Sequence, residues 1–313
     1  MFVIKHRKIF YGISIAMVAI SLFAIFNWGI KFGIDFAGGS ILEVEYTETK
    51  TQKEIVIDDI NSLGLEKEFS VRETGEAGYI IRSTTLTDTE KNQIISAIGE
   101  QNPVEEIRFN TVGPTLGKEL VSKGITAFMV IVISIILFVA YTFREVSKPV
   151  SSWKYGFVSI LAFVHDVLVP VGLFAFLGQF YGIEVDTLFI VAILVVLGYS
   201  INDTIVVFDR IRDNLKKVKE SERKDKFEKV VGKSLKQVYA RSINTSITTL
   251  IALVAIFIWG GESTKWFSLA LITGVIAGTY SSIFFASPML VTLSKMKPSA
   301  KKVEKVEESE ENK

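Results

Sequence analysis

The sequence predicts an all-α membrane protein, a bundle of six helices, with one α+β domain inserted after the first helix. Its composition is too apolar for a water-soluble chain: 49% of the 313 residues are hydrophobic, and the mean hydropathy is +0.38. The apolar residues gather in runs close to the length of about 20 residues that crosses about 30 Å of hydrocarbon. Six such runs cover residues 9–28, 125–143, 156–178, 187–208, 243–261 and 265–293. Only the segment between the first two runs is long and mixed enough to fold outside the membrane.

The six runs divide the chain into parts of different character. These are 1–28, the N-terminus and first span; 29–122, the α+β domain; 123–208, spans two to four; 209–242, a basic segment; 243–293, spans five and six; and 294–313, a tail whose lysine and glutamate mixture predicts disorder.

Basic residues are unevenly distributed along the chain and predict its orientation. The N-terminus is basic, as are the loop 144–154 and the segment 209–242, whereas the loop 179–186 carries two acids and no base. Because cytoplasmic loops are enriched in lysine and arginine, both termini are expected in the cytoplasm and the α+β domain outside. The first span resembles a signal peptide but lacks a small-x-small cleavage site, so we expect an uncleaved anchor.

The inserted segment alternates between strand and helix patterns. Strands are predicted at 41–46, 69–73, 79–85 and 106–112, and helices at 53–63 and from Thr87 or Asp88 to Gln101. The order β-α-β-β-α-β is that of a ferredoxin-like split βαβ unit. The segment contains no histidine, cysteine or glycine-rich phosphate loop, which favours a binding or mechanical module over an enzyme. With no cysteine and only His6 and His165 in the chain, the sequence predicts no metal or cofactor, and the net charge of +1 suggests no nucleic-acid partner.

Two carboxylates lie within predicted spans, where a charge costs about 2.5 to 3.5 kcal/mol even on the lenient insertion scale. Asp166 is near the middle of span three, beside His165, and Asp203 is in the cytoplasmic half of span four. Near Asp203 the apolar pattern gives way to three polar residues, Ser200, Asn202 and Thr204. This stretch is therefore expected to face protein or water rather than lipid.

Span five offers a matching polar face at helical spacing. The residues on it are Arg241, Asn244, Thr245, Thr248 and Thr249. A carboxylate near an arginine and a series of hydroxyls and amides is the layout of a proton path, because the arginine and burial have opposite effects on the proton affinity of the carboxylate.

Each of these residues also has a structural interpretation. Asp203 and Arg241 are equally consistent with a fixed ion pair that sets helix packing. The pattern favours helix-to-helix hydrogen bonding for His165 and Asp166, and capping for Asp35. Gly274 and Gly278 form a GxxxG step that predicts close packing of span six.

Four segments resemble the SecF family. They are FGIDFAGGS at 32–40, VGPTLGKEL at 112–120, GYSINDTIVVFDRIRDN at 198–214 and ARSINTSITTL at 240–250. The similarity extends over about residues 5–293, and it implies half of a transporter of the resistance-nodulation-division class. It also implies a bacterial inner-membrane subunit that works with SecD, the SecYEG translocon and YajC on exported unfolded polypeptides, within membrane lipids. Asp203 and Arg241 fall where the family places the groups implicated in proton-driven export, which favours the functional interpretation of that pair.

Two other functions are compatible with parts of the sequence. A related exporter of small molecules or lipids fits the same carboxylate and arginine, although one modest outer domain is small for a substrate porter. An intramembrane aspartyl protease using Asp166 and Asp203 is disfavoured, since neither carboxylate lies in a GxGD or YD setting. The apolar stripe of 216–238, formed by Phe227, Val230, Val231, Leu235 and Val238, predicts a helix along the membrane surface.

Overall fold

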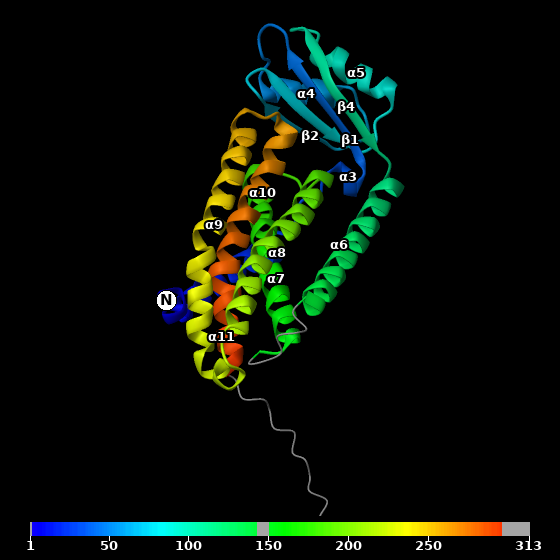
Figure 1. The fold of residues 1–313 in the computed structure, drawn as a ribbon. Helices are drawn as coiled ribbons and strands as arrows, with labels where there is room; N and C mark the ends of the chain where they lie inside the picture. Colours follow the sequence, from blue (N-terminus) through cyan, green and yellow to red (C-terminus); the bar gives the residue numbers. More distant parts are fainter. Residues whose placement is uncertain (1, 143–149, 296–313) are drawn as a thin grey trace, which may run out of the picture.

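The computed structural model describes residues 2–142 and 150–295 (Figure 1). The predicted disordered tail therefore lies almost wholly outside the described residues, as do Arg144 and Lys148 of the basic loop. The described part holds six helices long and apolar enough to cross a membrane, as the sequence predicts. Their elements are α2 (Arg7–Trp28), α6 (Pro114–Thr142), α7 (Ser152–Tyr181), α8 (Thr187–Lys216), α9 (Arg223–Trp259) and α10 (Glu262–Tyr280).

The ends of the bundle are completed by short elements. Helix α1 (Phe2–Lys5) precedes α2, and a 3₁₀ turn, η1 (Glu220–Glu222), joins α8 to α9. After α10 the chain continues without a break through one π-helical segment, η2 (Ser281–Ala286), into α11 (Ser287–Lys295). Such π segments are rare and are often found at functional sites.

The outer domain contains a four-stranded antiparallel sheet, in the order β2-β3-β1-β4. Its elements are β1 (Gly39–Tyr46), α4 (Lys53–Ser62), β2 (Phe69–Thr74), β3 (Gly78–Ser83), α5 (Asp88–Ile98) and β4 (Val104–Val112). This order and the two crossover helices confirm the ferredoxin-like prediction. Helix α5 begins with a capping box, in which Thr87 and Glu90 each bond the other's backbone N–H.

The two faces of the sheet have different neighbours. Side chains that point to α4 and α5, such as Leu42, Val44 and Ile81, are fully buried in an apolar core. On the other face, Arg82 of β3 pairs with Glu184 in the loop between α7 and α8, and Arg72 of β2 donates to the Gly182 carbonyl over 3.1 Å. The outer domain is therefore attached to the membrane bundle by polar contacts.

Burial disfavours the charged forms of two side chains at this junction. It lowers the pKa of the Arg82 guanidinium to about 10, with nearby Arg72 acting in the same direction. Burial also raises the pKa of Asp186, which caps α8 by accepting from the Phe189 N–H over 2.9 Å. The nearby carboxylate of Asp35 raises it further.

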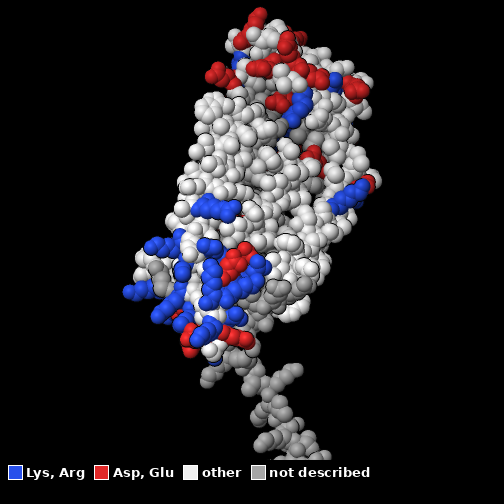
Figure 2. Space-filling model, in the orientation of Figure 1, with Lys and Arg blue, Asp and Glu red and all other residues white. Residues whose placement is uncertain are grey.

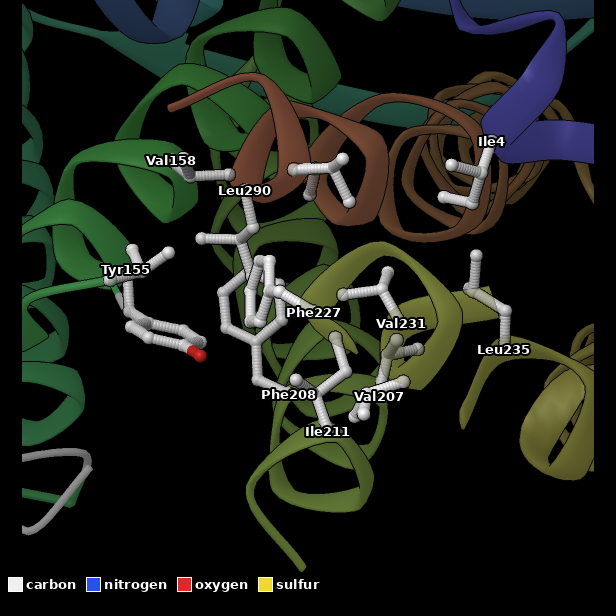
Figure 3. Close-up of a cluster of buried hydrophobic side chains, with 14 of the residues drawn as sticks. Ile4, Tyr155, Val158, Val207, Phe208, Ile211, Phe227, Val231, Leu235 and Leu290 are labelled. Atoms are coloured by element: carbon white, nitrogen blue, oxygen red, sulfur yellow. The ribbon is translucent and has the colours of Figure 1, made fainter. Parts of the chain in front are cut away.

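The charged segment between spans four and five does not lie along the membrane surface as expected. It forms the continuation of α8 and the first turns of α9, two helices that pack together as a hairpin (Figure 1). Phe227, Val231 and Leu235 of its apolar stripe are buried against Phe208, Ile211 and Leu290 (Figure 3). The stripe is apolar because it completes the protein core, and a stripe of this kind looks the same in sequence whether lipid or protein covers it.

Charge divides the molecule into three zones, visible in Figure 2. Acidic residues are concentrated on the outer domain, the surface of the helical bundle below it is almost free of charge, and the opposite end is rich in lysine and arginine. The end rich in lysine and arginine is the one that the loop charges predict to be cytoplasmic.

Candidate functional site

The site is built around the Asp203 carboxylate, on the inward side of α8. Its Oδ1 accepts a hydrogen bond from the Ser242 hydroxyl of α9, and its Oδ2 is buried without a hydrogen-bond partner among the described residues. The side chain lines a cavity of about 140 Å³ between the two helices. One oxygen of the carboxylate is thus bonded to α9, and the side chain also borders a small cavity lined mainly by polar residues.

Arg241 lies at the same cavity, as the sequence predicts, but it is not paired with Asp203. Both residues line the cavity together with Asn202 and Thr245, yet no ion pair within the described part of the chain joins them. Arg241 is exposed at the bundle surface. A fixed ion pair is therefore not the arrangement of this structure, and the role of Arg241 in a proton path stays a prediction.

The polar residues of α9 form an exposed stripe within a predicted span. Asn244, Thr245 and Thr248 are exposed, and so is Asn202 of α8 beside them. The threonines satisfy their own hydroxyls by bonding to helix carbonyls: Thr245 to Arg241 over 2.9 Å, and Thr248 to Thr245 over 2.9 Å. The stripe is a surface that lipid would cover poorly and that a polar partner would suit.

A second carboxylate, Asp166 of α7, lies in the interior of the bundle. It is fully buried and accepts three hydrogen bonds: from His165 Nδ1 at 2.9 Å, Ser200 Oγ of α8 at 2.5 Å and Ser281 Oγ of η2 at 2.8 Å. This is the helix-to-helix bonding that the structural interpretation describes. The Nε2 atom of His165 is buried and has no partner among the described residues.

Hydroxyls continue the polar interior on both sides of α8. Thr204 bonds Ser282 over 2.8 Å, Tyr199 donates to Ser246 over 3.1 Å, and Ser246 bonds Thr279 over 2.7 Å. Polar contacts thus connect α8 to α7, α9 and η2, and they bracket both carboxylates.

Close packing of span six against span four makes these contacts possible. A Cβ on Gly274 would lie 2.2 Å from the Val196 side chain, and one on Gly278 would lie 3.1 Å from that of Ser200. The predicted packing role of the GxxxG step is confirmed, because only glycine permits this approach.

Asp35 connects the outer domain to the helix that carries Asp203. Its Oδ2 accepts the Thr187 N–H, the first of α8, over 2.9 Å. Beside it, the Gly33 N–H donates to the Val185 carbonyl over 2.8 Å, and the Val185 N–H donates to the Lys31 carbonyl over 2.8 Å. Asp35 therefore caps α8, a helix distant in the sequence, and not the short helix in which Asp35 itself lies.

Sequence reasoning found neither Ser242 as the partner of Asp203 nor Ser281 as a partner of Asp166. Both are small residues in polar or glycine-rich stretches, where a serine is usually a packing residue. The one available signal was the spacing of Ser242 and Ser246, which lie one helical turn apart along the edge of the predicted polar face. Among the described residues, no group of three or more histidine, cysteine, aspartate or glutamate side chains could hold a metal ion.

Comparison with known families decides what kind of protein carries this site. The family described as "Protein export membrane protein SecD/SecF, C-terminal" matches residues 92–296, and the "SecD/SecF GG Motif" matches residues 23–50. The chain belongs to the SecD/SecF family. The glycine motif of this family contains Asp35, so the capping contact of α8 lies in one of the family's defining segments.

Relatives within the family are similar over nearly their whole length. The protein translocase subunit SecF of Thermobaculum terrenum is 37% identical, with 93% of each chain covered. That of Anaerolinea thermophila is 36% identical, with 92% of each covered. The crystal structure of SecDF, a translocon-associated membrane protein from Thermus thermophilus, has a TM-score of 0.79 and 27% identity over 94% of this chain, which spans only 38% of the SecDF chain.

Proposed function

We propose that this multi-pass membrane protein is a SecF-type export subunit. With SecD it couples the proton or sodium motive force to late, ATP-independent movement of secreted polypeptides through SecYEG. Similarity to SecF subunits over more than nine-tenths of the chain supports the role in protein export. The geometry around Asp203 supports the coupling to an ion gradient.

The observation that carries the proposal is the position of the Asp203 carboxylate in a span, half-buried beside a polar cavity. A charge at the middle of the bilayer costs about 2.5 to 3.5 kcal/mol and a charge nearer the end of a span costs part of that, so a carboxylate without a fixed cationic partner needs a functional explanation. Proton uptake removes that cost, and each charge moved through 100 mV supplies about 2.3 kcal/mol. Asp203 is thus suited to alternate between protonated and charged states as the bundle moves.

The exposed polar stripe of α9 supports a partner subunit. Asn244 and Thr248 are exposed in a predicted span, with Arg241 exposed just before it, and lipid cannot supply hydrogen bonds to these side chains. A second six-helix bundle seated against this stripe would cover these side chains and enclose the Asp203 cavity. SecD is the partner that we propose, since this chain corresponds to only part of the SecDF chain.

Helix α8 links the ion site to the outer domain. Its first N–H is held by Asp35, the loop before it is held by Arg82 and Arg72, and Asp203 lies further along the same helix. A displacement of α8 on protonation of Asp203 is therefore transmitted to the outer domain. We place that domain outside the bacterial cytoplasmic membrane, where it acts on the emerging polypeptide, with both termini in the cytoplasm.

The test is an export assay on membrane vesicles that carry the full chain with SecD. Asp203→Asn keeps the shape of the side chain and removes its charge change, so we expect late, gradient-dependent translocation to be lost. Asp209→Asn is the matched control: Asp209 is also on α8, but it is 43% exposed and pairs with Arg212 over 2.6 Å. Export by Asp203→Asn at the unmodified rate would exclude the mechanism. Imposing a pH gradient or a sodium gradient in turn identifies the ion.

A further inference from the structure

A basic cavity lies where the N-terminus meets the far end of the bundle from the outer domain. Its volume is about 660 Å³. It is lined by Phe2, Ile4, Lys5, His6, Arg7, Lys8 and Glu228. The cavity exists because Ile4, which is 1% exposed, anchors the short helix α1 to the apolar core beside α9 and α11.

The single acid at this cavity is already neutralised by two bases. Glu228 of α9 pairs with Arg7 over 3.4 Å and with Lys295 of α11 over 2.5 Å. Lys5 and Lys8 are both exposed and take part in no ion pair among the described residues. The cavity therefore has an excess of positive charge, which favours an anionic ligand.

The level of the cavity in the bundle favours a lipid over a soluble anion. Helix α2, the first span, begins at Arg7, so the lysines lie where the hydrocarbon ends and lipid phosphates begin. Apolar side chains flank the charges on the outside: Phe2 is 68% exposed and Ile9 is 60% exposed. Figure 2 shows this end of the molecule, where lysine and arginine side chains are dense below the uncharged belt. A ligand with a phosphate and acyl chains would satisfy both the basic and the apolar groups.

We propose that this cavity binds the phosphate headgroup of an anionic phospholipid, with Lys5 and Lys8 as its charge partners and Phe2 and Ile9 against its acyl chains. Basic pockets beside membrane helices on the side rich in lysine and arginine are suited to such headgroups. The bound lipid would fix the N-terminus of the first span against α9, whose far half carries Arg241 and Ser242.

The experiment compares retention of phosphatidylglycerol by the full chain, purified in detergent, using native mass spectrometry. The variant Lys5→Gln with Lys8→Gln removes the proposed charge partners. Lys233→Gln with Lys236→Gln is the matched control, since both lysines are exposed on α9, have the same spacing and do not line the cavity. We expect the affinity for phosphatidylglycerol to fall roughly thirtyfold in the first variant and no more than about threefold in the control.

Several outcomes would overturn the proposal. Equal loss in both double variants would mean diffuse attraction to the basic surface, and unchanged retention in the first would mean that lipid does not bind here. Displacement of phosphatidylglycerol by inorganic phosphate at millimolar concentration would assign the cavity to a soluble anion. Loss of a copurifying protein with unchanged lipid retention would assign it to a protein partner. An unchanged elution profile and melting temperature show that the variants are folded.

Discussion

Asp203 of α8 accepts its hydrogen bond from Ser242 of α9, the residue that directly follows Arg241. The serine holds the carboxylate on the inner side of α9, while the arginine is at the exposed edge of the same cavity. The carboxylate is therefore placed by a neutral donor, and no ion pair within the described residues ties it to the cation at the cavity edge.

Ser242→Ala is expected to slow gradient-driven export without abolishing it. The alanine leaves both carboxylate oxygens of Asp203 without a donor from α9, and a hydrogen bond to a charged group contributes about 1.5 to 3 kcal/mol. We expect a rate reduction of about tenfold in the vesicle export assay. Ser242→Thr, which keeps the hydroxyl, should retain most of the activity; a Ser242→Ala variant as active as the unmodified protein would contradict a positioning role for Ser242.

Asp166 is expected to be essential for stability whatever its role in ion movement. Asp166→Ala leaves the donors on His165 and Ser200 without their acceptor in a buried site, which should cost about 3 to 5 kcal/mol, whereas the Ser281 hydroxyl keeps its bond to the Gly278 carbonyl. A thermal unfolding measurement in detergent would show the loss as a large fall in Tm.

Asp166→Asn separates the structural role from a role in the ion path. Asparagine keeps one acceptor oxygen and most of the shape, so it should be more stable than Asp166→Ala. A stable Asp166→Asn variant with normal gradient-dependent export would assign Asp166 to structure alone. A stable variant with no such export would place it on the ion path.

Gly274→Ala should destabilise the contact between α8 and α10. The added Cβ would lie 2.2 Å from a Val196 methyl, so one of the two helices must shift. Overpacking of this kind costs about 1 to 3 kcal/mol. Gly198→Ala on α8 is the control, because its Cβ would meet nothing within 4 Å; thermal unfolding of the two variants side by side measures the difference. Equal stability would show that α8 and α10 are not packed as closely as described.

The capping box at α5 should make the outer domain sensitive to acid. Bonds from Lys67 and from Thr87 lower the pKa of Glu90 from 4.5 to about 2. A lowered carboxylate pKa means that its stabilising contribution is complete above about pH 4.5 and is lost as the pH falls toward 2. The protection factors of the α5 amides, which compare their exchange with that of an unfolded chain at the same pH, should therefore fall across this window.

Glu90→Gln is the matched variant for that measurement. Its α5 amides should be less protected than those of the unmodified protein at pH 7, and their protection should change little between pH 4.5 and 2. The same acid-induced fall in protection in Glu90→Gln would mean that another group is responsible.

Much of this architecture could be predicted because the membrane requires apolar runs of a certain length and the sheet requires alternating side chains. Apolar runs of membrane-spanning length predicted the six spans, and the alternation at residues 41–46 and 79–85 predicted the central strands of the outer domain. The sequence did not decide what covers the basic segment, because an apolar stripe on a charged helix looks the same under lipid and under protein. Leu290, one of the residues that cover it, is distant in the sequence.

Local composition and spacing were enough to predict the spans, the order of the outer-domain elements and the presence of Asp166 and Asp203 in spans. The groups that these carboxylates meet depend instead on how the helices pack. Ser242 and Ser281 carry hydroxyls of ordinary appearance that meet the carboxylates only because α9 packs against α8 and η2 packs against α7. Likewise, Asp35 caps α8 across 152 residues of chain. A hydrogen bond acts over about 3 Å, so its partners are fixed by how helices pack and not by any pattern along the chain.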